Sequence, residues 1–120
     1  MFAHDLHVAL ASATLVGFLA TAIEGGIRAV HRGEAGRAAR AGLNISIVLV
    51  GMTAAAGLAM LVRGDRPREW LHVLYALLAF GMIPALDSVA LDAGPRAQGF
   101  ARFAGGLLGL VVLARLFATG

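Results

Sequence analysis

The sequence predicts an all-α integral membrane protein folded as a four-helix up-down bundle. Three observations lead to this fold class. First, 59% of the residues are hydrophobic and only 14% are charged, and secondly the mean hydropathy is +0.82, a composition that a soluble surface of this size could not accommodate. Thirdly, the apolar residues form four stretches, each near the roughly 20 residues that a helix needs to cross a hydrocarbon core of about 30 Å. One transmembrane domain is expected over residues 1–120, with helices at about 5–30, 42–63, 69–92 and 98–118.

The first expected helix has the position of a secretion signal but not its pattern. Residues 1–5 lack the basic segment that precedes the apolar part of a signal peptide. The apolar run also continues beyond the usual length of such a part, as far as Glu24 and Arg28. We therefore expect this helix to be retained in the mature protein.

Small residues in three of the expected helices, and a proline in the other, predict how the helices pack. Helices in lipid associate through close contact of small residues. Such residues recur at four-residue spacing: Ala13, Gly17, Thr21 and Gly25 in the first helix, Gly51, Ala55 and Ala59 in the second, and Gly105 and Gly109 in the fourth. In the third helix, Pro84 removes one backbone hydrogen bond, which predicts a kink that frees the carbonyl of Phe80.

The distribution of arginine predicts the topology. The connection between the first two helices is the most basic segment of the chain, with Arg28, Arg32, Arg37 and Arg40 against Glu24 and Glu34. Cytoplasmic loops of membrane proteins are rich in basic residues, so this connection is expected in the cytoplasm, with His31 in contact with water and both termini outside. All ten basic residues are arginine, which together with abundant alanine and glycine suggests a bacterial, GC-rich genome and an inner-membrane location. The net charge of +3 follows from this bias and does not indicate nucleic acid as a partner.

Histidines gather at the outer end of the predicted bundle. His4 and His7 lie on nearly the same face at the start of the first helix, and His72 lies at the start of the third. An up-down topology places these two helix starts on one side of the membrane. Arg115, near the end of the fourth helix, reaches the same level, and Tyr75 lies one turn inward from His72.

This arrangement matches the needs of one b-type haem. Such a haem takes two axial imidazoles from facing helices, and its propionates need an arginine or water at the membrane surface. His7 and His72 are the candidate iron ligands, Arg115 is the candidate propionate partner, and Tyr75 completes the candidate cofactor site. Two alternatives remain: interfacial histidines commonly only hydrogen-bond water or headgroups, and His72 could instead contact chlorophyll or quinone.

A second polar group is expected at the cytoplasmic end. Glu24 precedes Arg28 by four residues, the favourable order for an ion pair on a helix, and Asp87 and Arg102 reach a similar depth. Three further polar residues could complete this cluster: Asn44, Ser46 and Gln98. One interpretation is a salt-bridge network that locks the helix ends. The other is a pathway for protons or cations, in which one carboxylate exchanges protons.

The helix plan, the histidines at same-side ends of the first and third helices, and the run "LHVLYALLA" at residues 71–79 resemble small membrane cytochromes b and related four-helix haem-handling units. The resemblance covers the general plan of the chain and implies haem ligation by His7 and His72. Many such bundles hold two haems through two histidine pairs. The second and fourth helices here contain no histidine, so one bis-histidine site is the most that this chain could supply.

Two other four-helix families of similar length are less similar. Small multidrug transporters have a membrane-embedded glutamate in the first helix, but Glu24 lies near the helix end beside Arg28, and the aromatic-rich binding face of that family is missing. Fluoride channels depend on a helix break rich in threonine and serine and on phenylalanine pairs, and the sequence contains neither.

No nucleophile and base pair, phosphate loop or metal-ligand run is visible, and cysteine is absent, so we do not expect a stand-alone enzyme. The sequence instead predicts an accessory subunit of a bacterial respiratory or photosynthetic electron-transport complex, with a candidate site for one b-type haem between the first and third helices. The alternatives are a small dimeric proton-coupled transporter that uses Glu24, and a purely structural membrane subunit. The expected partners are the lipid bilayer and other membrane subunits or further copies of the chain.

Overall fold

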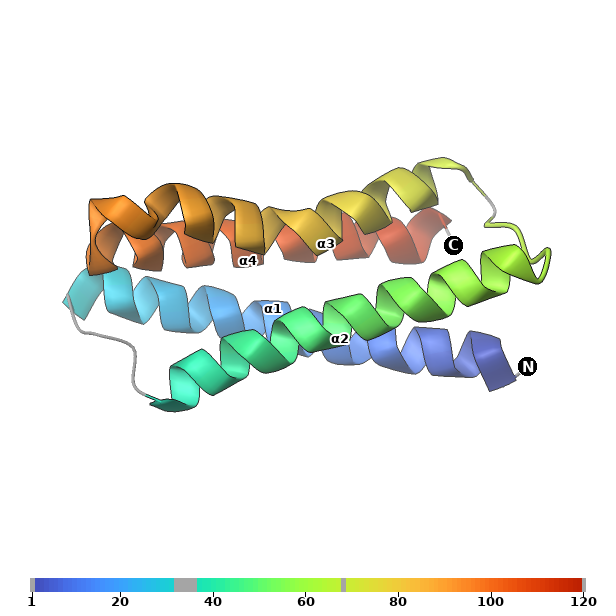
Figure 1. Ribbon diagram of the computed structural model, residues 1–120, viewed down its shortest axis with the longest axis horizontal. Coiled ribbons are helices and arrows are strands. Elements are labelled where there is room, and N and C mark those ends of the chain that lie inside the picture. Colours follow the sequence, from blue (N-terminus) through green and yellow to red (C-terminus); the bar gives the residue numbers. More distant parts are fainter. Residues whose placement is uncertain (1, 32–36, 68, 120) are drawn as a thin grey trace.

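The computed structural model describes residues 2–31, 37–67 and 69–119, and it confirms the all-α four-helix bundle (Figure 1). The helices are α1 (Phe2–His31), α2 (Arg37–Val62), α3 (Leu71–Ala90) and α4 (Pro95–Thr119), with a short 3₁₀ helix, η1 (Leu91–Ala93), between the last two. Each of the four long helices is long and apolar enough to cross a membrane. The chain is therefore a multi-pass membrane protein, elongated to 47 × 23 × 20 Å.

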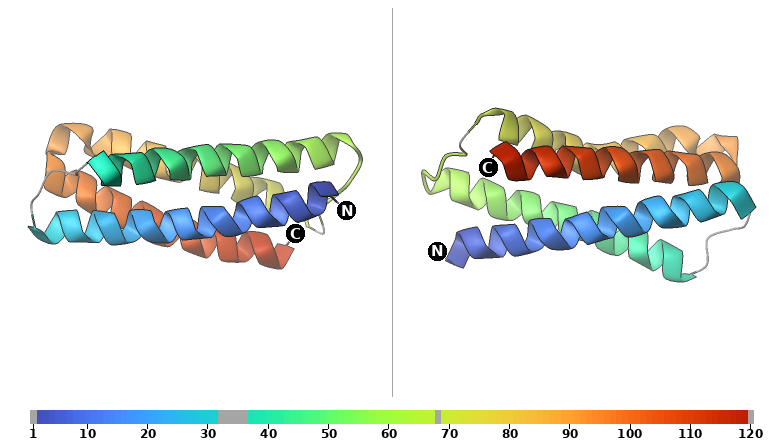
Figure 2. Two further views of the ribbon diagram at one scale, coloured as in Figure 1. Left: turned by 90° about the horizontal axis from the view of Figure 1, so that it is seen from below. Right: turned by 180° about the vertical axis from the view of Figure 1, so that it is seen from behind.

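The helices run alternately up and down, so the two chain ends lie at the same end of the bundle (Figure 1). The helices that pack side by side are α1 with α4, α3 with α4, and α1 with α2, while α2 and α3 make a smaller contact. Two further views show the same order (Figure 2). Consequently α1 and α3 face each other diagonally, and their N-terminal parts share one end of the bundle.

Helices α2 and α4 start earlier in the chain than the hydropathy of the sequence predicts. α2 starts at Arg37, inside the basic segment that was expected to be a loop. α4 starts at Pro95, a residue suited to the first helical position because its missing N–H has no partner there in any case. Just before it, Gly94 has a φ of 95°, a conformation that glycine adopts without strain and that reverses the chain after η1. In α3, which contains Pro84, the ribbon bends in its middle part (Figure 1).

The closest helix contact is between α1 and α4, and glycine makes it. A Cβ atom added to Gly25 would lie 2.5 Å from the backbone nitrogen of Phe103 and 2.6 Å from the carbonyl oxygen of Gly99. Likewise, a Cβ on Gly106 would lie 2.7 Å from both the backbone nitrogen and the Cβ of Ala22. The two backbones therefore approach to a distance that no larger residue would permit, as expected for helices in lipid.

The contact between α1 and α2 is built from hydroxyl groups. The Oγ1 atoms of Thr14 and Thr53 are 3.0 Å apart, and the Oγ1 of Thr21 lies 3.5 Å from the Oγ of Ser46. Each of these four hydroxyls also lies within hydrogen-bond distance of the carbonyl four residues before it in its own helix. The single proton of each hydroxyl has an acceptor either in its own helix or across the contact, so these side chains lie between the helices without an unpaired donor.

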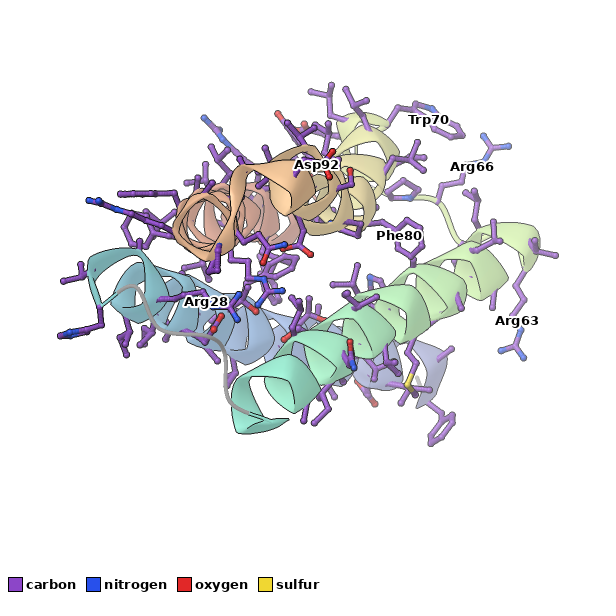
Figure 3. The ribbon with its side chains drawn as sticks, turned by 60° about the vertical axis from the view of Figure 1, so that its left-hand side comes forward. Arg28, Arg63, Arg66, Trp70, Phe80 and Asp92 are labelled. Carbon is purple, nitrogen blue, oxygen red and sulfur yellow. The ribbon has the colours of Figure 1, made fainter. Side chains whose placement is uncertain are left out.

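Most large apolar side chains point outward, as a lipid environment requires. Among the described residues, Phe18, Val50, Ala79 and Leu113 form a small buried apolar cluster. Figure 3 shows Trp70 and Arg66 projecting from the segment that links α2 to α3, and Phe80 in the space between those two helices. Ala55 and Ala59 of the α2 small-residue stripe are exposed, so they make no tight contact within the bundle.

Candidate functional site

His7 of α1 and His72 of α3 lie together at the end of the bundle that holds both chain ends. Their ring centroids are 6.1 Å apart and the ring planes are inclined by 54°. Both side chains are partly buried. We call these two residues the histidine pair.

The end of α4 positions His72. The backbone N–H of Glu69 donates to the carbonyl of Thr119 at 3.2 Å, which ties the start of α3 to the end of α4. The Nδ1 of His72 lies 3.1 Å from the carbonyl oxygen of Leu116, and the hydroxyl of Thr119 lies 3.5 Å from the same nitrogen. A carbonyl can only accept, so Nδ1 carries the proton and donates it, and a neutral ring then has its lone pair on Nε2.

His7 is set against α2. Its Nδ1 is buried and has no hydrogen-bond partner among the described residues. A Cβ on Gly57 of α2 would lie 3.1 Å from the Cε1 atom of His7, so the glycine provides the space for the imidazole. An unpaired nitrogen on a buried ring is costly, which makes this position available to a ligand or a water molecule.

The other residues expected at this site are placed differently. Arg115 is exposed on α4, and its backbone carbonyl accepts a hydrogen bond of 2.9 Å from the Thr119 hydroxyl. Tyr75 is partly buried one turn along α3, and His4 is exposed on α1. Among the described residues, no hydrogen bond or ion pair joins the side chains of Arg115 or Tyr75 to the histidine pair. Sequence reasoning missed Gly57, Leu116 and Thr119, because a glycine and two carbonyls carry no signal of what they face.

The donor set of the histidine pair suits a group that takes two imidazoles. Within residues 2–31, 37–67 and 69–119, no cluster of three or more histidine, aspartate or glutamate side chains could hold a metal ion alone. A tetrahedral zinc site is therefore not supported by these residues. A centroid separation of 6.1 Å is compatible both with a direct contact between the two rings and with a group held by both imidazoles. The donation by His72 to Leu116 is the kind of outer contact that orients a ligating histidine.

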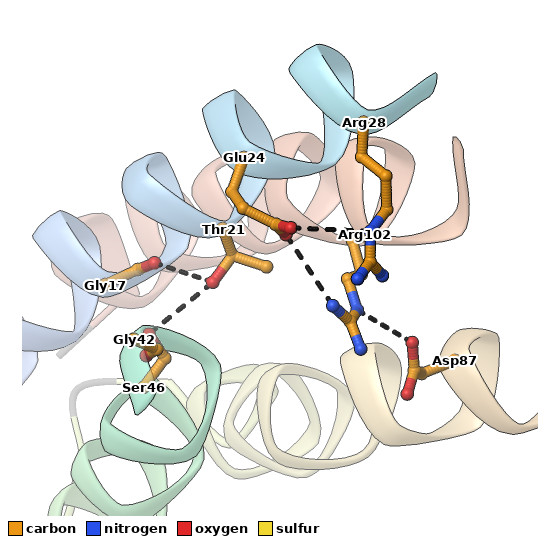
Figure 4. Close-up of polar contacts among 8 residues, drawn as sticks. All are labelled: Gly17, Thr21, Glu24, Arg28, Gly42, Ser46, Asp87 and Arg102. Atoms are coloured by element: carbon orange, nitrogen blue, oxygen red, sulfur yellow. Dashed lines mark hydrogen bonds and ion pairs between the residues drawn. The ribbon is translucent and has the colours of Figure 1, made fainter. Parts of the chain in front are cut away.

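A second polar group lies at the opposite end of the bundle, where α1, α3 and α4 meet (Figure 4). The Nε of Arg102 donates to the Oδ1 of Asp87 at 2.9 Å. Glu24 lies 3.7 Å from the Nε of Arg28 through one oxygen, and 3.7 Å from the Nη1 of Arg102 through the other. We call these four residues, Glu24, Arg28, Asp87 and Arg102, the ion-pair cluster.

The polar residues of α2 do not join the ion-pair cluster. Ser46 instead contacts Thr21 on α1, as Figure 4 shows, and Asn44 is exposed. Gln98 is partly buried, and its backbone N–H donates to Gly94. His31 is exposed at the end of α1. The structure thus brings together the four charged residues expected to cluster, while Ser46 supports a different contact.

No family model, curated protein or solved structure matches this chain. The histidine pair and the ion-pair cluster are therefore the features of the chain that bear on its function.

Proposed function

We propose that this protein is a small multi-pass subunit of a bacterial electron-transport assembly, respiratory or photosynthetic, that binds one b-type haem between α1 and α3. The observation that carries the proposal is the separation of 6.1 Å between the rings of His7 and His72. These two histidines come from diagonally opposed helices, the arrangement from which four-helix bundles build cofactor sites. Haem held in this way would supply a one-electron carrier.

The roles of the surrounding residues follow from their contacts. Leu116 accepts from Nδ1 of His72 and so fixes the ring with Nε2 free to bind. Gly57 leaves room beside His7. Arg115 is exposed at the same end, where its guanidinium can bind a carboxylate at the membrane surface. Most of the chain lies within its helices, which favours partnership with other membrane proteins or with further copies.

The proposed membrane is the bacterial inner membrane, with both termini outside. The basis is the arginine excess of the segment from Arg28 to Arg40, which favours the cytoplasmic side for that end of the bundle. The histidine pair then lies near the outer surface and the ion-pair cluster near the cytoplasmic one.

The alternative proposal, a dimeric proton-coupled transporter, requires Glu24 to bind and release a proton during each cycle. Glu24 has guanidinium groups 3.7 Å away on either side, from Arg28 and Arg102. Both ion pairs would have to open in each cycle, so the geometry gives more support to a structural role for this carboxylate. In liposomes, Glu24→Gln abolishes proton-coupled substrate movement if the transporter proposal is right, and unaffected transport removes Glu24 from that role.

The haem proposal is tested by an absorption spectrum of the protein purified in mild detergent. The wild type is expected to show a Soret band that disappears in both His7→Ala and His72→Ala. His4→Ala is the matched control, because His4 is exposed one turn away on the same helix and the band should persist. A colourless wild-type preparation at full membrane yield refutes the proposal, and co-purification of larger redox proteins in the same sample supports the subunit assignment.

A further inference from the structure

The ion-pair cluster leaves buried donors unused. Arg28 and Arg102 are each only 8% exposed, although both carry a permanent positive charge. Three of their nitrogen atoms are buried and have no hydrogen-bond partner: Nε and Nη1 of Arg28, and Nη1 of Arg102. Of the contacts between these arginines and the carboxylates, only the one from Arg102 to Asp87 is short enough for a hydrogen bond.

The described residues around the two arginines do not supply the missing acceptors. Glu24 already divides its two oxygens between the two arginines, at 3.7 Å each. The segments that pack around Arg28 are the closest part of the contact between α1 and α4, where Gly25, Ala29 and Gly99 meet. Glycine and alanine have no side-chain oxygen to offer. Among the described residues, no acceptor lies within hydrogen-bond distance of Nε or Nη1 of Arg28, so these donors are left for an acceptor that is not among those residues.

The position favours a phosphate oxyanion as that acceptor. The cluster lies near the bundle end where α1 and α3 finish and α4 begins, at the level expected for lipid headgroups. Guanidinium groups bind phosphate through paired N–H donors, and basic sites between transmembrane helices bind anionic lipid headgroups. Two arginines from different helices with unused donors have the chemistry of such a site (Figure 4).

We propose that Arg28 and Arg102 bind a phosphate group at the ion-pair cluster, where α1, α3 and α4 meet, either the headgroup of an anionic phospholipid or free inorganic phosphate. The bound group accepts from Nε and Nη1 of Arg28 and from Nη1 of Arg102, the three donors without a partner. It thereby joins the first and fourth helices at the end opposite the histidine pair. This proposal is independent of the haem.

The test measures the thermal unfolding of the full chain in a neutral detergent, followed by the fluorescence of its single tryptophan, Trp70. Phosphatidylglycerol, phosphatidylcholine and inorganic phosphate are added separately. Phosphatidylglycerol is expected to raise the Tm of the wild type by about 5 °C, because a ligand that binds only the folded state stabilises it. Arg28→Gln should lose at least half of this shift. Arg96→Gln is the matched control, since Arg96 is exposed at the same end of the bundle, over the ring of Phe100, and its loss removes the same charge.

The outcomes separate the sources of the phosphate. A shift with phosphatidylglycerol alone assigns the site to a lipid headgroup, and an equal shift with inorganic phosphate assigns it to the free ion. The proposal is overturned if no addition shifts the Tm of the wild type. It is also overturned if the wild type, Arg28→Gln and Arg96→Gln show the same shift. Should Arg28→Gln give no folded protein, Arg28→Lys is measured in the same way, because lysine keeps the charge but lacks the paired donors. A full wild-type response in that variant also overturns the proposal.

Discussion

Replacement of Gly25 by alanine tests whether the contact between α1 and α4 determines stability. The added Cβ would lie 2.5 Å from the backbone nitrogen of Phe103 and 2.6 Å from the carbonyl oxygen of Gly99. Favourable contact begins at about 3.5 Å, so the helices must separate locally by about 1 Å. Both opposing atoms are backbone, and neither can turn away as a flexible side chain could. The expected loss is about 1–3 kcal/mol of unfolding free energy, the usual range for overpacking, or a Tm lower by roughly 5–15 °C.

The matched control is Gly81→Ala in α3, where a Cβ would meet nothing within 4 Å. Alanine is the better helix former, so this variant should gain about 0.5–1 kcal/mol or stay unchanged. Both variants are compared with the wild type by unfolding in mixed micelles of mild detergent and SDS. If Gly25→Ala is as stable as Gly81→Ala, the helices do not approach as closely as described and the reasoning is wrong.

Two further predictions concern polar contacts. Asp87→Ala removes the 2.9 Å partner of Arg102 and leaves a buried guanidinium nitrogen unpaired, so the free energy of unfolding should fall by about 1–3 kcal/mol. Asp92→Ala is the control, because the Asp92 carboxylate is exposed, and it should change this free energy by less than about 0.5 kcal/mol. Equal unfolding curves for these two variants would contradict the assigned role of the ion pair. A double-mutant cycle of Thr14→Val and Thr53→Val, whose hydroxyls are 3.0 Å apart, should give a coupling of about 0.6 kcal/mol, and additive effects would show that the hydroxyls do not interact.

The fold class could be predicted because it depends on quantities that a sequence carries directly, namely the length and hydropathy of four segments. The neighbours of each helix could not be predicted from these quantities. The stripe Ala13, Gly17, Thr21 and Gly25 predicts close packing without naming a neighbour. In the structure, Gly17 and Thr21 meet Ser46 of α2 while Gly25 meets α4. An α-helix has 3.6 residues per turn, so each step of four residues turns by about 40° around the axis. Over three steps the stripe passes from one neighbour to the other.

The ion-pair cluster could be predicted more fully than the surroundings of the histidine pair, for a related reason. Charged residues near helix ends have few ways to be satisfied in a bundle, so the meeting of Glu24, Arg102 and Asp87 could be anticipated from depth and charge alone. The meeting of His7 and His72 was also expected from depth, but the groups that orient them were not. Those groups are a backbone carbonyl, at Leu116, and an absent side chain, at Gly57, and neither has a pattern in the sequence.

The pairing of α1 with α4 also sets an order for biosynthesis. Helices enter the membrane as the chain is made, so α1 meets its closest neighbour only after the fourth helix has been synthesised. Until then its available neighbour is α2, which it contacts through the Thr14 and Thr21 hydroxyls. The hydroxyl contacts are therefore formed early, and the glycine contact completes the assembly. In this interval Glu24 lacks the contact with Arg102, so a chain arrested before Arg102 would leave the ion-pair cluster incomplete.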